Sequence, residues 1–279
     1  LLPGMLYSQL FDEAVEGAEE EKKGGVEFNG FLQNNDLQEL AFASEDDEEI
    51  SAAFLKGHLS SGLLDKLALI VERLDGPLAV RSSSLLEDSM HQPFAGIYLT
   101  FMIPNNHPKA KDRLKDLCNA IRLVYASTFF QNAKSFLRAT GNRIEEEKMA
   151  VVIQEVVGHE YNGKNYPNIS GVAQSYNYYP VGRAKPEDGV VSLALGLGKT
   201  IVDGGTSLQY SPAYPHVYPQ FGTTRDLFHN SQLNFFACRM PLALRSSTRS
   251  SWPRSARMAS RSCRGSCCST RMPASPRTS

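Results

Sequence analysis

The sequence predicts an α+β fold, in which helices and strands mix without a regular βαβ alternation. Apolar residues recur at a helical period in residues 62–74 and 109–140. Apolar runs of strand length occupy residues 77–81, 149–157 and 190–195, and Gly or Pro residues separate many of these segments. A chain of 279 residues is long enough for one large domain or two small ones.

The first 76 residues are predicted to be mainly helical. Residues 5–16 form a short amphipathic pattern, and Ser60 and Ser61 are suitable caps for a helix over residues 62–74. The acidic residues 45–49 follow Ser44 and precede an apolar stretch. Acids in a first helical turn complement the helix dipole, so this run indicates a helix start rather than a metal site.

The middle of the chain combines a strand pair with a long helical pattern. Residues 77–81 and 96–102 are predicted to pair around the loop of residues 84–94. The pattern over residues 109–140 predicts one long helix that ends at Gly141. Its aromatic residues are expected to belong to the core rather than to a ligand site; they are Tyr125, Phe129, Phe130 and Phe136.

One segment suggests phosphate chemistry: Val80-Arg81-Ser82-Ser83-Ser84, followed by Glu87-Asp88 and by Phe94-Ala95-Gly96. Arginine offers a planar fork of donors, and glycine lets backbone N–H groups approach an anion closely. The alternative is structural, because arginine and serine also stabilise turns. The residues alone leave both interpretations open.

Further blocks follow in a fixed order: Val152-Ile153-Gln154-Glu155-Val156-Val157, Ile169-Ser170-Gly171-Val172-Ala173, and Ala194-Leu195-Gly196-Leu197-Gly198-Lys199 running to Gly204-Gly205. Together with the arginine segment, they resemble the nucleotide-binding domain of the phosphoenolpyruvate synthase and pyruvate phosphate dikinase family. The resemblance implies a two-lobed ATP-grasp-like fold that is incomplete at its C-terminal end. Strands are expected over residues 168–176 and 190–195, with a close backbone approach at Gly171.

The resemblance also implies the site residues. Arg81 would be catalytic, binding the transferring phosphates, and Ser82 and Ser83 would shape its loop. A loop containing Gly96, Ile97, Tyr98 and Thr100 would close over the triphosphate. The segment between the two lobes would hold adenine through Gln154, Glu155, Val156 and Val157. A structural alternative for Gln154 and Glu155 is that they mark where a buried strand leaves the core.

By the same resemblance, the complete enzyme would use ATP and Mg²⁺ to phosphorylate a histidine on a separate swivelling domain and then pyruvate, giving phosphoenolpyruvate, AMP and phosphate. The expected partners are that phosphohistidine domain and a pyruvate-binding domain. The family's Gly-Gly-Lys-Gly segment, its Mg²⁺-ligating glutamate and its Gln-x-Arg-Pro strand have no match here, so this chain is expected to be inactive alone, with its metal ligands unknown. A dikinase for an antibiotic or a glucan, or a non-catalytic nucleotide-binding module, are alternatives.

Several other motifs carry less information. Gly198-Lys199-Thr200 resembles part of a P-loop, but Leu193 stands where that motif needs glycine. Lys199 is expected to pair with a phosphate or to lie in solvent, and His91 to be an ordinary loop residue. The chain has no run of 18 apolar residues and no leader pattern, which predicts a cytoplasmic protein that binds no membrane.

The last part of the chain has a different composition. Residues 239–279 contain nine Arg and no Lys, Asp or Glu, so the remaining residues carry a net charge of −10, which argues against nucleic-acid binding by that part of the chain. For the tail itself, a natural disordered tract that binds nucleic acid is the alternative to a frameshift. We therefore expect an N-terminal helical segment at 1–76, a nucleotide-binding domain at 77–237, and a disordered or frameshifted Arg/Ser-rich tail at 238–279. Only one cysteine precedes this tail, so no disulfide framework is predicted; the other four are Cys238, Cys263, Cys267 and Cys268.

Overall fold

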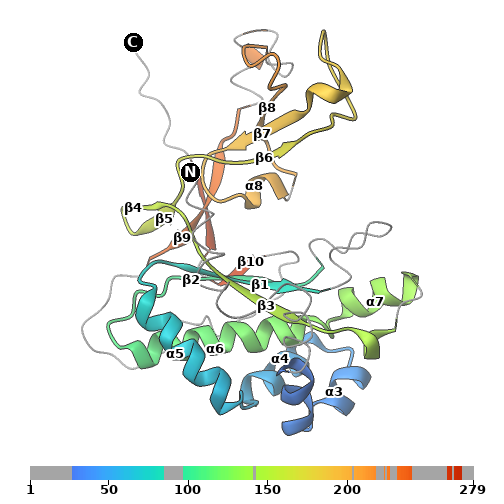
Figure 1. Cartoon of the computed structure of the whole chain (residues 1–279), viewed down its shortest axis with the longest axis vertical. Coiled ribbons are helices and arrows are strands. Elements are labelled where there is room, and N and C mark those ends of the chain that lie inside the picture. The colour runs from blue at the N-terminus through green and yellow to red at the C-terminus, as the bar shows by residue number, and fades with distance from the viewer. Residues whose placement is uncertain are drawn as a thin grey trace. The chain divides into compact units, whose positions relative to one another are not determined.

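The computed structural model describes residues 27–84, 97–140, 143–202, 204–217, 223, 225–226, 231–240, 263–265 and 267–271. The chain divides into two compact units, which are considered separately (Figure 1). Unit 1 comprises Leu1–Glu155 with Ser246–Gly265, and unit 2 comprises Val156–Arg245 with Ser266–Ser279. The chain passes from unit 1 to unit 2 between Glu155 and Val156. The helix expected at residues 5–16 lies outside the described residues.

Unit 1 combines helices with one sheet, whose strand order is β10-β2-β1-β3. Residues 27–34 are also helical. The elements are α3 (Gln38–Ala43), α4 (Asp47–Lys56), α5 (Ser61–Arg73), β1 (Leu78–Ser83), β2 (Thr100–Ile103), α6 (Ala110–Ser127), α7 (Gln131–Thr140), η2 (Ile144–Glu146), β3 (Ala150–Glu155) and β10 (Cys263–Gly265).

The predicted helix starts in unit 1 are confirmed. The acidic run opens α4, and the side chain of Asp46 accepts a hydrogen bond from the Glu48 N–H at 2.8 Å. The Ser60 hydroxyl accepts one from the Leu63 N–H at 3.2 Å and caps α5. These contacts satisfy backbone donors that a helix cannot satisfy internally.

The single helix predicted over residues 109–140 is wrong, because the structure breaks it into α6 and α7. Two side-chain contacts with residues of α3, α4 and the segment between them explain the break. The Asp47 carboxylate accepts a hydrogen bond from the Gln131 N–H at 2.9 Å, which caps α7 from outside. The Lys134 ammonium donates to the Phe42 and Ser44 carbonyls, and burial lowers the pKa of Lys134. The helical periodicity of the sequence does not reveal such long-range contacts.

The core of unit 1 lies between the helices and one face of the sheet. In the register, Val80 of β1 lies opposite Phe101 of β2 and Ile153 of β3, and these side chains belong to the core or pack against it. The predicted aromatic core is confirmed: Phe129 is 1% exposed, and its ring packs against those of Phe28, Phe42 and Phe54. The opposite face of the sheet is not covered in this way, since Val152 is 38% exposed.

Unit 2 contains two small sheets, of strand order β11-β9-β5-β4 and β6-β7-β8. The strands predicted at residues 168–176 and 190–195 are confirmed as β6 and β7. The elements are β4 (His159–Tyr161), β5 (Lys164–Tyr166), β6 (Ser170–Gln174), η3 (Pro186–Asp188), β7 (Val190–Ala194), α8 (Lys199–Val202), β8 (Leu208–Tyr210), β9 (Asn234–Arg239) and β11 (Cys267–Arg271).

The tail contributes backbone to the sheet of unit 1 and to the β11-β9-β5-β4 sheet of unit 2. β9 continues through Cys238 to Arg239, β10 pairs with β2, and β11 pairs with β9. The expected boundaries at residues 77 and 238, and the origin of the tail, stay predictions. None of the described helices combines the length and apolar character that a membrane span requires.

Phe129 provides a test of the unit 1 core. We expect Phe129→Ala to lower the free energy of unfolding by about 3–5 kcal/mol, because it removes a fully buried ring from a packed cluster. Leu69→Ala is the control, since Leu69 is 52% exposed on α5 and its truncation should cost less than about 0.5 kcal/mol. Urea unfolding followed by far-UV circular dichroism measures both, and equal losses in the two variants would contradict this assignment of the core.

Candidate functional site

The candidate site begins with the face of the β1-β2-β3 sheet that points away from the core. Alternation along the strands puts a set of side chains there, and we term this the open face: Arg81, Ser83, Thr100, Met102, Val152 and Gln154. Arg81 is exposed and lies opposite Val152 in the register. Its Nη1 lies 3.5 Å from Oε1 of Gln154, two residues further along β3. The sheet therefore brings together two residues that are 73 positions apart.

The Arg81–Gln154 contact is a weak one. A guanidinium donor usually lies about 2.7–3.0 Å from a strong acceptor, and 3.5 Å is the outer limit of a hydrogen bond. The contact therefore orients the guanidinium without binding it tightly. Breaking it costs little, which leaves the fork of donors available for a stronger anionic acceptor.

The three residues of the arginine segment do not share one face. Ser83 alternates with Arg81 and lies on the open face opposite Ala150, whereas Ser82 lies opposite Val151 and its side chain points to the other face. Ser83 is half-buried. The structure thus places one serine hydroxyl, rather than two, on the side of the arginine.

The loop that is expected to close over phosphates leads into β2, and its last residues pack in the core. Gly96 lies outside the described residues. Ile97 packs against the core, and Tyr98 is 2% exposed within it. These two side chains therefore pack in the core of unit 1 and not on the open face. Thr100, the first residue of β2, lies on the open face.

The last predicted segment crosses the boundary between the two units. Gln154 and Glu155 end β3, and Glu155 lies opposite Leu78, beside the turn at Gly76. A Cβ at position 76 would lie 2.5 Å from the Glu155 Oε1 atom, so glycine there leaves room for this carboxylate. Val156 and Val157 begin unit 2, and Val157 is 68% exposed.

In unit 2, the glycine blocks of the sequence meet around Gly196. The Ser170 hydroxyl donates to the Gly196 carbonyl at 2.7 Å, and the Leu197 N–H donates to the Phe236 carbonyl at 2.8 Å. Gly196 has φ +83°, and a Cβ on it would lie 2.6 Å from the Phe236 carbonyl oxygen. The close backbone approach expected at Gly171 is confirmed, since a Cβ there would lie 2.9 Å from the Ser192 carbonyl oxygen.

Gln232 joins these blocks, and sequence reasoning gave it no role. Its Oε1 accepts from the Leu195 N–H at 2.8 Å, and its Nε2 donates to the carbonyls of Leu195 and Asn234. One side chain thus binds the backbone of Leu195, which follows β7, and of Asn234 in β9. A single glutamine at the edge of a recognisable segment carries no pattern that would reveal this contact.

Lys199 follows the Gly-Leu-Gly segment at the start of α8. Its ammonium lies 5.3 Å from the centre of the Phe236 ring, a cation–π contact. A role for this lysine with phosphate stays a prediction. His91 lies outside the described residues. Within the described ranges, no three His, Cys, Asp or Glu side chains gather closely enough to hold a metal ion, so Mg²⁺ stays a prediction that accompanies ATP.

Comparison with known proteins identifies the family of this chain. The family model "Pyruvate phosphate dikinase, AMP/ATP-binding domain" matches residues 18–220, which include the open face and the glycine blocks. The chain belongs to this family. The resemblance inferred from the four sequence blocks is therefore confirmed, together with the α+β, ATP-grasp-like fold class. The dikinase AMP/ATP-binding family is defined by nucleotide binding, so the motifs described above lie in a nucleotide-binding domain.

A curated relative extends the comparison. The chain is 28% identical over 180 residues to the uncharacterized phosphotransferase YvkC of Bacillus subtilis (strain 168). The aligned region covers 63% of this chain and 19% of that protein. The chain thus spans about a fifth of the length of this relative, and the match falls within a much longer phosphotransferase.

The two glycines of the Gly-Leu-Gly segment form a matched pair for a test. We expect Gly196→Ala to lower the free energy of unfolding by about 2–4 kcal/mol, because Gly196 combines a left-handed backbone with a clash against Phe236. Gly198 has open space around its Cα, so Gly198→Ala should change stability by less than about 1 kcal/mol. Urea unfolding measures both variants. Equal tolerance at the two positions would contradict the geometry around Gly196.

Proposed function

We propose that this chain binds ATP on the open face of the β1-β2-β3 sheet, as the nucleotide-binding part of a longer phosphotransferase. The observation that carries the proposal is the juxtaposition of Arg81 and Gln154 on that face, in a chain that belongs to a nucleotide-binding family. An arginine fork suits phosphate oxygens, and an amide carries both a donor and an acceptor, as the edge of adenine does.

The register gives the proposed site a direction. Gln154 lies opposite Ala79, whereas Ser83 lies opposite Ala150, four residues along β3. At roughly 3.3 Å per residue this separation is about 13 Å, which is long enough for an extended nucleotide. We place adenine at the Gln154 end and the phosphates at the Ser83 end.

Arg81 lies between these two ends and supplies the positive charge. Its guanidinium would leave the weak contact with Gln154 and turn toward the phosphates, where charge-assisted bonds are stronger. Phosphoryl transfer depends mainly on positioning and on charge neutralisation, so an arginine bound to the phosphates supports catalysis without covalent chemistry. The Ser83 hydroxyl and the backbone of the loop ending at Ile97 and Tyr98 would add neutral donors.

The complete protein is proposed to act like a phosphoenolpyruvate synthase. The β- and γ-phosphates of ATP would pass to a histidine on a separate swivelling domain, leaving AMP. Water would release the γ-phosphate as free phosphate, and the histidine would pass the remaining phosphoryl group to pyruvate, giving phosphoenolpyruvate. Mg²⁺ bound with ATP would neutralise phosphate charge. Membership of the dikinase family and the similarity to a phosphotransferase support this proposal. Its localisation is proposed to be cytoplasmic.

Arg81→Ala tests the site directly. We expect this variant to bind ATP in the presence of Mg²⁺ more weakly by about 1.5–3 kcal/mol, the usual loss when hydrogen bonds to a charged group are removed. Arg138→Ala is the matched control, because Arg138 is exposed on α7, where its Nη1 lies 3.5 Å from Glu45 Oε1, and its loss should leave ATP affinity unchanged. Titration calorimetry on the 279-residue chain measures all three proteins. An unchanged affinity of Arg81→Ala would reject the proposed phosphate contact.

A further inference from the structure

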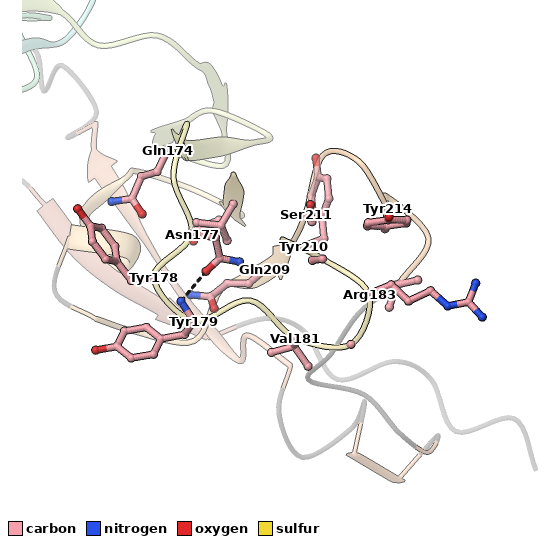
Figure 2. A pocket seen from close by; sticks show the side chains of 15 residues that line it. Gln174, Asn177, Tyr178, Tyr179, Val181, Arg183, Gln209, Tyr210, Ser211 and Tyr214 are labelled. Atoms are coloured by element: carbon pink, nitrogen blue, oxygen red, sulfur yellow. Dashed lines mark hydrogen bonds between the residues drawn. The ribbon is translucent and has the colours of Figure 1, made fainter. Parts of the chain in front are cut away.

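Unit 2 contains a cavity of about 560 Å³ beside the β6-β7-β8 sheet. Two segments line it, one between residues 174 and 192 and the other between residues 209 and 217 (Figure 2). Its volume falls in the range of about 300–1,000 Å³ that is typical of small-molecule sites. None of the residues proposed above to bind ATP lines this cavity, so it requires an explanation of its own.

Tyrosine rings form much of the lining. Tyr178 and Tyr179 belong to the first segment, and Tyr210 and Tyr214 to the second. Tyr178 is 76% and Tyr179 is 88% exposed, which is unusual for such large rings. Exposed aromatic rings gathered around a hollow indicate a binding surface, because their apolar faces gain by being covered.

A buried hydroxyl gives a second, independent indication. Ser211 lines the cavity and is 9% exposed, and its Oγ has no hydrogen-bond partner in the part of the chain that the structure describes. Buried polar atoms in native proteins are nearly always hydrogen-bonded, so an unpartnered one calls for a ligand or a water molecule. A bound ligand with a polar group facing Ser211 would satisfy it.

Side-chain amides supply the other polar groups. Oδ1 of Asn177 accepts a hydrogen bond from the Tyr179 N–H at 3.0 Å, drawn as a dashed line in Figure 2. This bond orients the amide and leaves its NH₂ group able to donate. Gln174 adds a second amide from the end of β6. Amides both donate and accept hydrogen bonds.

Formal charge is scarce in the described lining. Arg183 is its charged member, and its side chain extends away from the other labelled residues (Figure 2). A phosphate or carboxylate ligand would need a cation directed inward. The cavity instead offers ring faces, amides and hydroxyls, which suit an uncharged ligand that carries many polar groups.

We infer that this cavity binds a neutral sugar. The C–H groups on the face of a pyranose ring carry a slight positive charge that matches the negative face of a tyrosine ring. Sugar hydroxyls both donate and accept, as the amides of Gln174 and Asn177 and the hydroxyl of Ser211 do. These polar groups come from both segments, which matches hydroxyls spaced around a ring. A nucleobase, which is a flat aromatic ring with its polar atoms in the ring plane, is the competing ligand.

Calorimetric titration of the full 279-residue chain with maltoheptaose, cellohexaose and mannohexaose tests this inference. We expect saturable binding of at least one of these neutral oligosaccharides. Tyr179→Ala should weaken it about tenfold through the loss of a stacking face, and Ser211→Ala about fivefold through the loss of a neutral hydrogen bond. Tyr161→Ala is the matched control, because Tyr161 is an exposed tyrosine on β4 that does not line the cavity.

Each other outcome overturns the inference. Absence of saturable binding by all three oligosaccharides would reject a sugar site. Binding that Tyr179→Ala and Ser211→Ala leave unchanged would place the sugar elsewhere. Adenosine binding that Tyr179→Ala abolishes and Arg81→Ala leaves intact would assign the cavity to a nucleobase. Circular dichroism spectra of the variants confirm folding, and Tyr179 is exposed enough that its truncation removes no core contact.

Discussion

The pairing register of β1 with β3 determines most of what unit 1 can do. With Val80 opposite Ile153, the apolar residues of both strands face the helices, and Arg81 and Gln154 face the opposite side. A slip of one residue would exchange the two faces, burying the arginine and exposing the valine. The burial of the apolar face therefore fixes the position of the polar face. The proposed nucleotide site and the stability of the core depend on the same hydrogen-bonded ladder.

The two units achieve their order in different ways. Unit 1 packs one face of its sheet against helices and a cluster of aromatic rings, so its fold depends on apolar burial. Unit 2 exposes several large apolar side chains, including Val157, Ile169 and Val202. Its segments are joined instead by close backbone approaches at Gly171 and Gly196 and by the hydrogen bonds of Gln232. Substitutions at these three positions should therefore matter more than the modest burial of unit 2 suggests.

Local signals predicted the strands and helix starts well. The caps at Asp46 and Ser60 and the strands β1, β6 and β7 depend on residues close in sequence, which single-sequence patterns report. The division between α6 and α7 was not predicted, because the hydrogen bonds of Asp47 and Lys134 that mark it join residues far apart in the sequence. The exposure of one face of β3 was not predicted either, since an apolar run in the sequence does not reveal that Val152 is exposed.

The candidate site shows the same limit. Sequence blocks identified Arg81 and Gln154 and the family to which they belong, but only the register shows that their side chains meet. The alternation of side chains along β1 puts Ser82 and Ser83 on opposite faces of the sheet, and the side chain of Tyr98 is buried in the core. The tyrosine-lined cavity left no recognisable motif, because its members are spread over two segments of the chain and owe their proximity to the β6-β7-β8 sheet.

Photolabelling with 8-azido-ATP tests most directly whether the nucleotide lies on the open face. After irradiation, mass spectrometry locates the modified peptide, and excess ATP serves as the competitor. We expect ATP-protected labelling within residues 150–157, where β3 ends and the adenine is placed. Protected labelling confined to residues 174–217, around the tyrosine-lined cavity, would contradict the proposed location of the nucleotide.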